Sequence, residues 1–295
     1  MPWLQLTFAM REEEEANALA DLLPETAAVA VTLRDGADQP LFEPLPGETP
    51  LWQQTLITAL YEEGTVVAEV ITQLARLWAP RQLPEHQLQI LEDQIWERAW
   101  MEGFTPMCFG KRLWIVPSWS APPQPDAINL HLDPGLAFGT GTHPTTRLCL
   151  QWLDSHPPTA QEVVDYGCGS GVLAIAAILL GANHCLCIDN DPQALEATLD
   201  NGSRNGLTEQ LTTALPETAT TTTPVDLLLA NILAAPLMEL APHLGARVKV
   251  GGRIILSGIL EEQWQEVARH YLPHFQLDPP EILDGWVRLS GQRRR

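Results

Sequence analysis

The chain has 295 residues, of which 45% are hydrophobic, so it is long enough to form two cores of ordinary size. It contains no apolar run of the roughly eighteen residues that a membrane span needs, and its N-terminal stretch turns acidic where a signal peptide requires a basic start. We therefore expect a cytoplasmic protein with no membrane segment. The formal net charge of −20 repels nucleic acid, so we expect no direct contact with DNA or RNA.

Charge and cysteine content limit the partners of the chain further. Residues 1–105 carry 18 acids and 5 bases, a net charge of −13, and the remaining residues carry −7. This charge fits both a surface that keeps the protein in solution and a surface that attracts a basic partner, and charge alone does not separate the two. The five cysteines are odd in number and include no C-x-x-C pair, so we expect reduced thiols and no metal site.

The first 91 residues alternate strands and helices at short spacing. Hydrophobic periodicity predicts strands at residues 3–8, 28–34, 55–61 and 87–91, and helices at residues 12–23 and 66–78. A proline-rich connection, FEPLPGETP, separates the two halves and excludes a continuous helix there. The resulting order, β-α-β followed by β-α-β, predicts a small α+β ferredoxin-like domain over residues 1–91.

A linker helix is predicted next, over residues 92–107. Its apolar residues recur at helical spacing, at Ile95, Trp96, Ala99 and Trp100. Pro106 ends the run, because proline cannot continue a helix. Packing of the linker accounts for the two tryptophans more simply than stacking on a substrate.

Residues 108–295 follow the pattern of an α/β domain. Apolar strands are predicted at residues 162–165, 184–189, 225–230 and 253–257. The helices between them begin near Gly171, Pro192 and Pro236, and this alternation indicates a mostly parallel sheet. The closing stretch, FQLDPPEILDGWVRLSG, is predicted to form an antiparallel pair of strands.

A glycine loop is the strongest local signal in this domain. In EVVDYGCGSGVLAIAAILLGA, a strand ends at Asp165, glycines follow at positions 167, 169 and 171, and an alanine-rich helix begins at once. Glycine suits a sharp strand-to-helix turn and the close approach of a ligand to the backbone, and the helix N-terminus adds free N–H groups. The spacing departs from the dinucleotide pattern G-x-G-x-x-G, since position 172 is valine.

An acidic side chain follows the next predicted strand. Asp189, in the segment CIDNDP, is the last residue of the predicted strand at 184–189, where a carboxylate can accept hydrogen bonds from both ribose hydroxyls of an adenosine. Each signal alone is weak, because an isolated glycine loop is often only a tight turn. Together, in a βαβ unit, they predict a nucleoside-bearing cofactor at the carboxyl edge of the sheet.

The acid two residues before the first glycine gives the form D-x-G-x-G-x-G, which resembles the class I methyltransferases that depend on S-adenosylmethionine. Four further stretches are similar to the family within that class that methylates protein eleven of the large ribosomal subunit: WERAWMEGF at 96–104, LDPGLAFGTGTHPTT at 132–146, ANIL at 230–233 and GGRIILSGIL at 251–260. The resemblance implies a Rossmann-like methyltransferase domain over residues 108–295 and a substrate-recognition role for residues 1–91. It implies S-adenosylmethionine as the cofactor and methylation of lysine side chains and of the N-terminal amine of that ribosomal protein. We expect the enzyme to be a monomer.

The same resemblance implies cofactor contacts at Thr146, Gly167, Asp189 and Asn231. Asn231 follows the predicted strand VDLLLA, and we assign its side-chain oxygen to positioning the acceptor amine, because an amide does not titrate. All four keep structural alternatives. Gly167 could be a purely structural glycine, Asn231 could be a turn residue, and Thr146 could bond a preceding helical carbonyl. Asp189 could cap the helix near Pro192, although Asn190 and Asp191 suit that cap better.

The turn-rich stretch at 132–146 contains no acid or base pair that would suit a hydrolase. Glycines at 135, 139 and 141 would let the chain fold closely over a cofactor, and a helix beginning at Thr142 would bring Thr146 towards it. His143 precedes a proline, so we interpret it as a helix-start residue and not as a general base. The stretch is therefore predicted to form one wall of the cofactor pocket.

Three other functions remain open from the sequence alone. A nicotinamide-dependent oxidoreductase would also bind adenosine, but Val172 and the missing acid/base pair disfavour it. A non-catalytic binding module could keep the cofactor fold. A methyltransferase for amide or base nitrogens is disfavoured, because many of those enzymes have the motif N-P-P-Y and this chain has Ile232 and Leu233 in place of its two prolines.

Overall fold

The computed structural model describes residues 3–37, 51–91, 104–133, 141–219 and 223–294. The chain divides into two compact units, Met1–Trp100 and Met101–Arg295. Most of the predicted linker helix, residues 92–103, lies outside the described residues. The exact domain boundaries at residues 91 and 108 therefore stay predictions.

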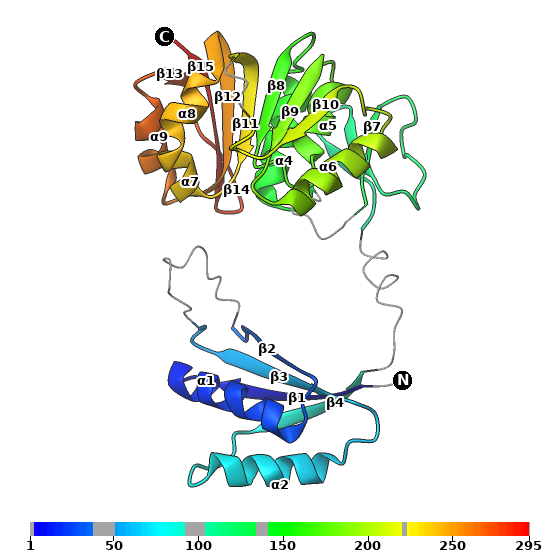
Figure 1. Ribbon diagram of the computed structural model, residues 1–295, viewed down its shortest axis with the longest axis vertical. Coiled ribbons are helices and arrows are strands. Elements are labelled where there is room, and N and C mark those ends of the chain that lie inside the picture. The colour runs from blue at the N-terminus through cyan, green and yellow to red at the C-terminus, as the bar shows by residue number, and fades with distance from the viewer. Residues whose placement is uncertain (1–2, 38–50, 92–103, 134–140, 220–222, 295) are drawn as a thin grey trace. The chain divides into compact units, whose positions relative to one another are not determined.

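The first unit is a four-stranded antiparallel sheet with its helices on one face (Figure 1). Its strand order, β2-β3-β1-β4, is that of the predicted ferredoxin-like fold, in which the first strand of the second β-α-β half lies between the two strands of the first half. The elements are β1 (Trp3–Met10), α1 (Glu13–Leu22), the 3₁₀ turn η1 (Leu23–Thr26), β2 (Ala30–Asp35), β3 (Thr55–Tyr61), α2 (Val67–Trp78) and β4 (His86–Leu91).

Alternation of side chains along the strands builds the core of this unit. In β3, odd-numbered residues from Thr55 to Tyr61 are buried, and the residues between them are partly exposed. Successive side chains of a strand point to opposite faces, so one face meets the helices and the other does not. Leu19 of α1 and Leu74 of α2 close the core and are fully buried.

The second unit contains an eight-stranded sheet with the order β10-β9-β8-β11-β12-β15-β13, and β14 pairs with β15. The pairs from β10 to β12 are parallel, and β15 runs antiparallel to its neighbours, which confirms the predicted α/β class. The strands are β8 (Glu162–Tyr166), β9 (His184–Ile188), β10 (Leu211–Ala214), β11 (Val225–Asn231), β12 (Val248–Leu260), β13 (Phe275–Leu277), β14 (Glu281–Leu283) and β15 (Trp286–Arg293).

Helices cover both faces of this sheet (Figure 1). On one face, α4 (Pro144–Ser155) and α5 (Val172–Leu179) bury Leu153 and Ile175 against Val163, with α6 (Pro192–Arg204) beside them. On the other face, α7 (Ala234–Glu239), α8 (Ala241–Ala246) and α9 (Trp264–Tyr271) pack over Val164 and Leu228. Burial on both faces explains the continuous apolar runs of the central strands.

The order of the strands places a binding site at one edge. From β8 the chain moves outward through β9 to β10, and then returns to lay β11 on the other side of β8. The loops after β8 and β11 therefore leave the same sheet edge in opposite directions. In open α/β sheets, ligands bind in the crevice outside this switch point.

Several short elements were not predicted. A separate sheet is formed by β5 (Met107–Phe109), β6 (Leu113–Val116) and β7 (Ile128–His131), which are too short to carry a periodic pattern. The predicted antiparallel pair in the closing stretch is confirmed for β14 and β15, but Phe275–Leu277 adds a third strand. Asp284 and Gly285, both with positive φ, form the tight turn between β14 and β15.

Candidate cofactor and acceptor site

The glycine loop leaves β8 in left-handed backbone conformations. Gly167, Gly169 and Gly171 have φ values of 76°, 54° and 77°, a region that disfavours residues with a Cβ. The loop is fixed to the end of β9, because the Gly167 N–H donates to the Ile188 carbonyl at 2.7 Å. A Cβ at Gly167 would also lie 2.2 Å from Cγ2 of Ile232, so glycine is required there for space as well as for φ.

Asp165 lies beneath this loop and is completely buried. Its Oδ2 accepts the Ala174 N–H at 3.1 Å, which ties the strand to the helix after the loop, and its Oδ1 has no partner among the described residues. Burial raises the pKa of the carboxyl to about 7, with a smaller contribution from the negative charge of Asp189. Asp165 therefore organises the loop from below and does not line the cavity.

Asp189 follows β9 and reaches the loop from the other side. Its Oδ2 accepts the Gly169 N–H at 2.9 Å, and its Oδ1 accepts the Asp191 N–H at 3.0 Å. Asp191 is the N-cap of α6 and accepts the Gln193 N–H at 2.9 Å, which confirms that the cap belongs to a neighbour of Asp189. Asp189 is left at the wall of a cavity with a carboxylate that still has capacity to accept hydrogen bonds.

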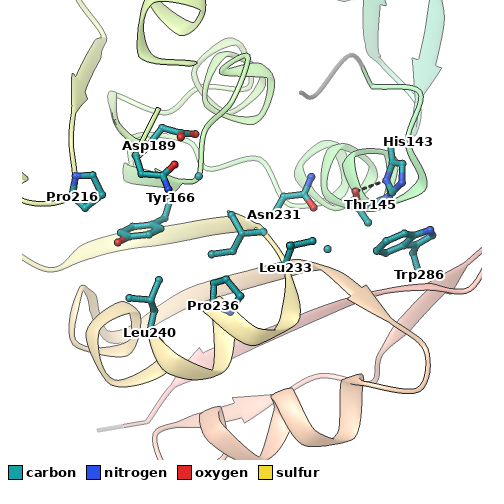
Figure 2. A pocket seen from close by; sticks show the side chains of 14 residues that line it. His143, Thr145, Tyr166, Asp189, Pro216, Asn231, Leu233, Pro236, Leu240 and Trp286 are labelled. Carbon is teal, nitrogen blue, oxygen red and sulfur yellow. Dashed lines mark hydrogen bonds between the residues drawn. The ribbon is translucent and has the colours of Figure 1, made fainter. Parts of the chain in front are cut away.

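A cavity of about 590 Å³ opens at the switch point of the sheet (Figure 2). This volume is in the usual range for cavities that bind small molecules. Apolar side chains form much of its wall, and Asp189 is the only carboxylate among the lining residues that the structure describes. The lining residues are His143, Thr145, Tyr166, Gly167, Asp189, Asn190, Pro216, Asn231, Ile232, Leu233, Pro236, Leu240, Gly258 and Trp286.

Asn231 is the last residue of β11 and projects into the middle of this cavity (Figure 2). Its Nδ2 donates to the Thr146 hydroxyl at 3.3 Å, and its buried Oδ1 has no partner among the described residues. A buried acceptor without a partner costs free energy, so this oxygen is suited to an N–H donor supplied by a ligand. The structure thus brings Asn231 and Thr146 together, as the sequence analysis expected for two site residues.

Thr146 is placed differently from its neighbour in α4. It is fully buried against Asn231, whereas Thr145 lines the cavity and Thr146 does not. The helix begins at Pro144, so the predicted start at Thr142 was two residues too early. Among the described residues, the Thr146 hydroxyl accepts from the side-chain amide of Asn231 and so orients that amide. A direct contact between Thr146 and a cofactor remains a prediction.

His143 is the N-cap of α4, as its position before proline predicted. Its Nδ1 lies 2.7 Å from the Thr145 hydroxyl and accepts from the Thr145 N–H at 3.4 Å. Burial lowers the pKa of the imidazole, so the ring is neutral at pH 7 and the remaining proton is on Nε2. A neutral ring whose Nδ1 is engaged in this way is a poor proton acceptor, and it packs edge-on against Trp286 with the ring centres 4.8 Å apart.

Only part of the turn-rich stretch at 132–146 can be placed. Gly135 and Gly139 lie outside the described residues. Gly141 has a φ of 89°, and a Cβ there would lie 2.5 Å from Cδ1 of Ile115, so this glycine lets the chain pack on β6. Among the described residues of the stretch, His143 and Thr145 form a wall of the cavity.

Several lining residues were missed from the sequence. Tyr166 is the last residue of β8, and its place directly after the predicted strand at 162–165 was the one signal that could have identified it as a lining residue. Pro216 follows β10, a strand of four residues that was not predicted. Trp286 comes from the antiparallel strand β15, far from the other lining residues in sequence, and carries no local signal of a site.

Two other kinds of site find no support in the described parts of the chain. No three His, Cys, Asp or Glu side chains there are grouped so as to hold a metal ion. No described helix is both long enough and apolar enough to cross a membrane.

Comparison with known proteins identifies the family. The family model of "Ribosomal protein L11 methyltransferase (PrmA)" matches residues 2–294. The chain belongs to this family. Relatives named ribosomal protein L11 methyltransferase, from Pseudomonas fluorescens strain SBW25 and Pseudomonas savastanoi pv. phaseolicola, are each 54% identical over 295 residues, which is the full length of both chains.

A solved structure supports the same assignment. The ribosomal protein L11 methylase from Lactobacillus delbrueckii subsp. bulgaricus is 33% identical, with a TM-score of 0.58, and the match covers 65% of this chain and all of that chain. The family resemblance drawn from the glycine loop and the four flanking stretches is therefore confirmed.

Proposed function

We propose that this chain transfers methyl groups from S-adenosylmethionine to lysine side chains and to the N-terminal amine of ribosomal protein L11. The full-length match to L11 methyltransferases supports the proposal. The observation that carries it is the buried, unpartnered Oδ1 of Asn231, which lies in the same cavity as the glycine loop and Asp189. This arrangement places an uncharged acceptor for an amine N–H next to a site for a nucleoside.

The described residues fit the methyl donor. The Asp189 carboxylate is available to the two ribose hydroxyls, and the absence of a side chain at Gly167 lets a ligand lie against the backbone of the loop. When bound, S-adenosylmethionine supplies a methyl group that its sulfonium has already activated. The protein therefore needs to align the acceptor with the donor and exclude water.

The acceptor amine must lose its proton before it reacts. A free lysine has a pKa of about 10.4, and an apolar environment lowers that pKa because it disfavours the charged form. Leu233, Pro236 and Trp286 supply apolar wall to the cavity around Asn231. The Asn231 oxygen would accept one amine N–H and so orient the amine, with the nitrogen lone pair pointing away from Asn231.

The acidic N-terminal unit suits a basic ribosomal substrate. We assign residues 1–91 to recognition of L11, because residues 1–105 carry a net charge of −13. Modification of several amines by one cavity requires the substrate to be presented in more than one orientation, and the linker at 92–107 would permit this. We further propose a cytoplasmic monomer that makes no direct contact with nucleic acid.

Labelled S-adenosylmethionine and purified large-subunit proteins test this function. After incubation with the enzyme, mass spectrometry should locate the label on lysine side chains and the N-terminal amine of L11, and on no other large-subunit protein. Tight binding of NADH without a response to S-adenosylmethionine would instead identify an oxidoreductase. Cofactor binding without transfer to any protein would identify a binding module that has kept the fold.

A further inference from the structure

We propose that Arg247 is a positioning residue for the nucleoside half of the methyl donor. It would act by fixing two walls of the cavity, the Pro216 turn and the Tyr166 ring, from outside the cavity. This inference rests on the proposed function, since it assigns the part of the cavity beside Asp189 to the nucleoside of S-adenosylmethionine.

Arg247 is buried directly after α8, with 8% of its surface exposed. Its Nη2 donates to the Ala219 carbonyl at 2.8 Å, and its Nε donates to Nε2 of His243 at 3.0 Å. Its own carbonyl accepts the Val225 N–H at 2.7 Å, at the start of β11. One side chain therefore connects α8 to the segment that follows β10, although Arg247 itself does not line the cavity.

The first wall is a compact turn after β10. The Ala219 N–H donates to the Leu215 carbonyl at 2.9 Å, and the N–H and hydroxyl of Thr218 each donate to the same carbonyl at 3.0 Å. Pro216 lies inside this turn and lines the cavity. Because Arg247 holds the Ala219 carbonyl at the end of the turn, it fixes the position of Pro216.

The second wall is the ring of Tyr166. Its centre lies 6.2 Å from that of His243, and the two rings are steeply inclined at 70°. His243 can accept from Arg247 only in its neutral form, and the partial desolvation of its ring together with the Arg247 charge lowers the pKa of the imidazole. Arg247 thus fixes the His243 ring, which packs beside Tyr166 and is not among the described residues that line the cavity.

Both walls lie at the nucleoside end of the cavity. Figure 2 shows Pro216 and Tyr166 beside Asp189, while His143, Thr145 and Trp286 lie at the opposite end, beyond Asn231. A flat, largely apolar base next to the ribose would therefore contact Pro216 and Tyr166. Displacing either wall should weaken binding of the nucleoside and leave the acceptor end unchanged.

The test measures affinity for S-adenosylhomocysteine and for adenosine by calorimetry, in the wild type and in R247M and R247K. Both variants should bind both compounds about tenfold more weakly, which corresponds to about 1.4 kcal/mol. The KM for S-adenosylmethionine should rise by a similar factor, and kcat at saturating donor should stay unchanged. R247K retains the charge but not the forked guanidinium geometry, so it should resemble R247M.

R293M is the matched control. Arg293 also donates to backbone carbonyls next to α8, those of Ala246 and Val248, but it does not line the cavity and has no described bond to either wall. R293M should lower the unfolding temperature without changing either affinity. A loss of affinity in R293M equal to that in R247M would show a general effect of stability and would overturn the proposal.

A second variant tests the tyrosine wall in a folded background. His243 is exposed, so H243Q should fold, and its amide oxygen can still accept from Arg247 while the ring beside Tyr166 is lost. Weaker binding of both compounds, by about threefold, would support the proposal, and unchanged affinity in H243Q, R247M and R247K would overturn it. If the wild type itself binds neither compound, the proposed function fails, which is a separate result.

Discussion

Replacing Gly167 by alanine should damage the site through two effects that the structure allows to be separated. The φ of 76° would place an alanine in the left-handed region, at a cost of about 1–2 kcal/mol. The new Cβ would also lie 2.2 Å from Cγ2 of Ile232, and such overpacking costs a further ~1–3 kcal/mol. The sum predicts a loss of about 2–5 kcal/mol.

Gly206 provides the matched control for the first effect. Its φ is 71°, and a Cβ there would meet no atom within 4 Å. G206A should therefore lose only the conformational share, about 1–2 kcal/mol. In a unit of this size each kcal/mol lowers Tm by about 2–4 °C, so thermal unfolding can distinguish the two variants.

Affinity for S-adenosylhomocysteine gives the second measurement. G206A should bind it as the wild type does, and G167A should bind it at least about tenfold more weakly, because Ile232 lines the cavity and must move. Equal losses of Tm in the two variants, together with unchanged affinity in G167A, would refute the claim that the loop needs glycine for space at this position.

Three further substitutions test individual side chains. D189A should weaken binding of S-adenosylhomocysteine at least about tenfold, because hydrogen bonds to charged groups contribute about 1.5–3 kcal/mol. D191A removes only the cap of α6 and should leave that affinity unchanged; if D189A also leaves it unchanged, Asp189 does not bind the ribose. N231L should lower the single-turnover rate of methyl transfer about a hundredfold at saturating donor, and an unchanged rate would contradict its role in orienting the amine. Asp165 keeps its proton up to about pH 7 when folded but releases it near 3.8 when unfolded, so its contribution to the free energy of unfolding falls as pH rises between these values, by up to about 4 kcal/mol. Urea denaturation of D165N should therefore show less loss of stability between pH 4 and 7 than the wild type, and parallel curves would argue against a raised pKa.

Elements with a regular pattern could be predicted closely from the sequence. The strand Thr55–Tyr61 has the predicted limits, although Leu56 and Leu60 on its partly exposed face weaken the apolar–polar alternation. The glycine loop and Asp189 were also predictable, since a sharp strand-to-helix turn with positive φ angles favours glycine over residues with a Cβ. Each of these signals is local, so neighbouring residues are sufficient to specify it.

The other side of the cavity depends on contacts that are distant in sequence. Successive residues of a helix differ by about 100° in direction, and the sequence does not show which of them faces a cavity, so Thr145 was not singled out as a lining residue. Pro216 and Trp286 reach the cavity only because the sheet order brings β10 and β15 to its two sides. Neither position carries a pattern of its own, and the sheet order itself was not predicted strand by strand.

The sheet order also has a consequence for synthesis of the protein. The glycine loop and Asp189 emerge from the ribosome well before β11 and β15, yet the Asn231 oxygen and the Trp286 ring complete the cavity. A nascent chain that has reached only β9 holds half of a nucleoside site and no place for an amine. Methylating activity therefore requires the last strands of the sheet to be translated and paired, because they supply the acceptor side of the cavity.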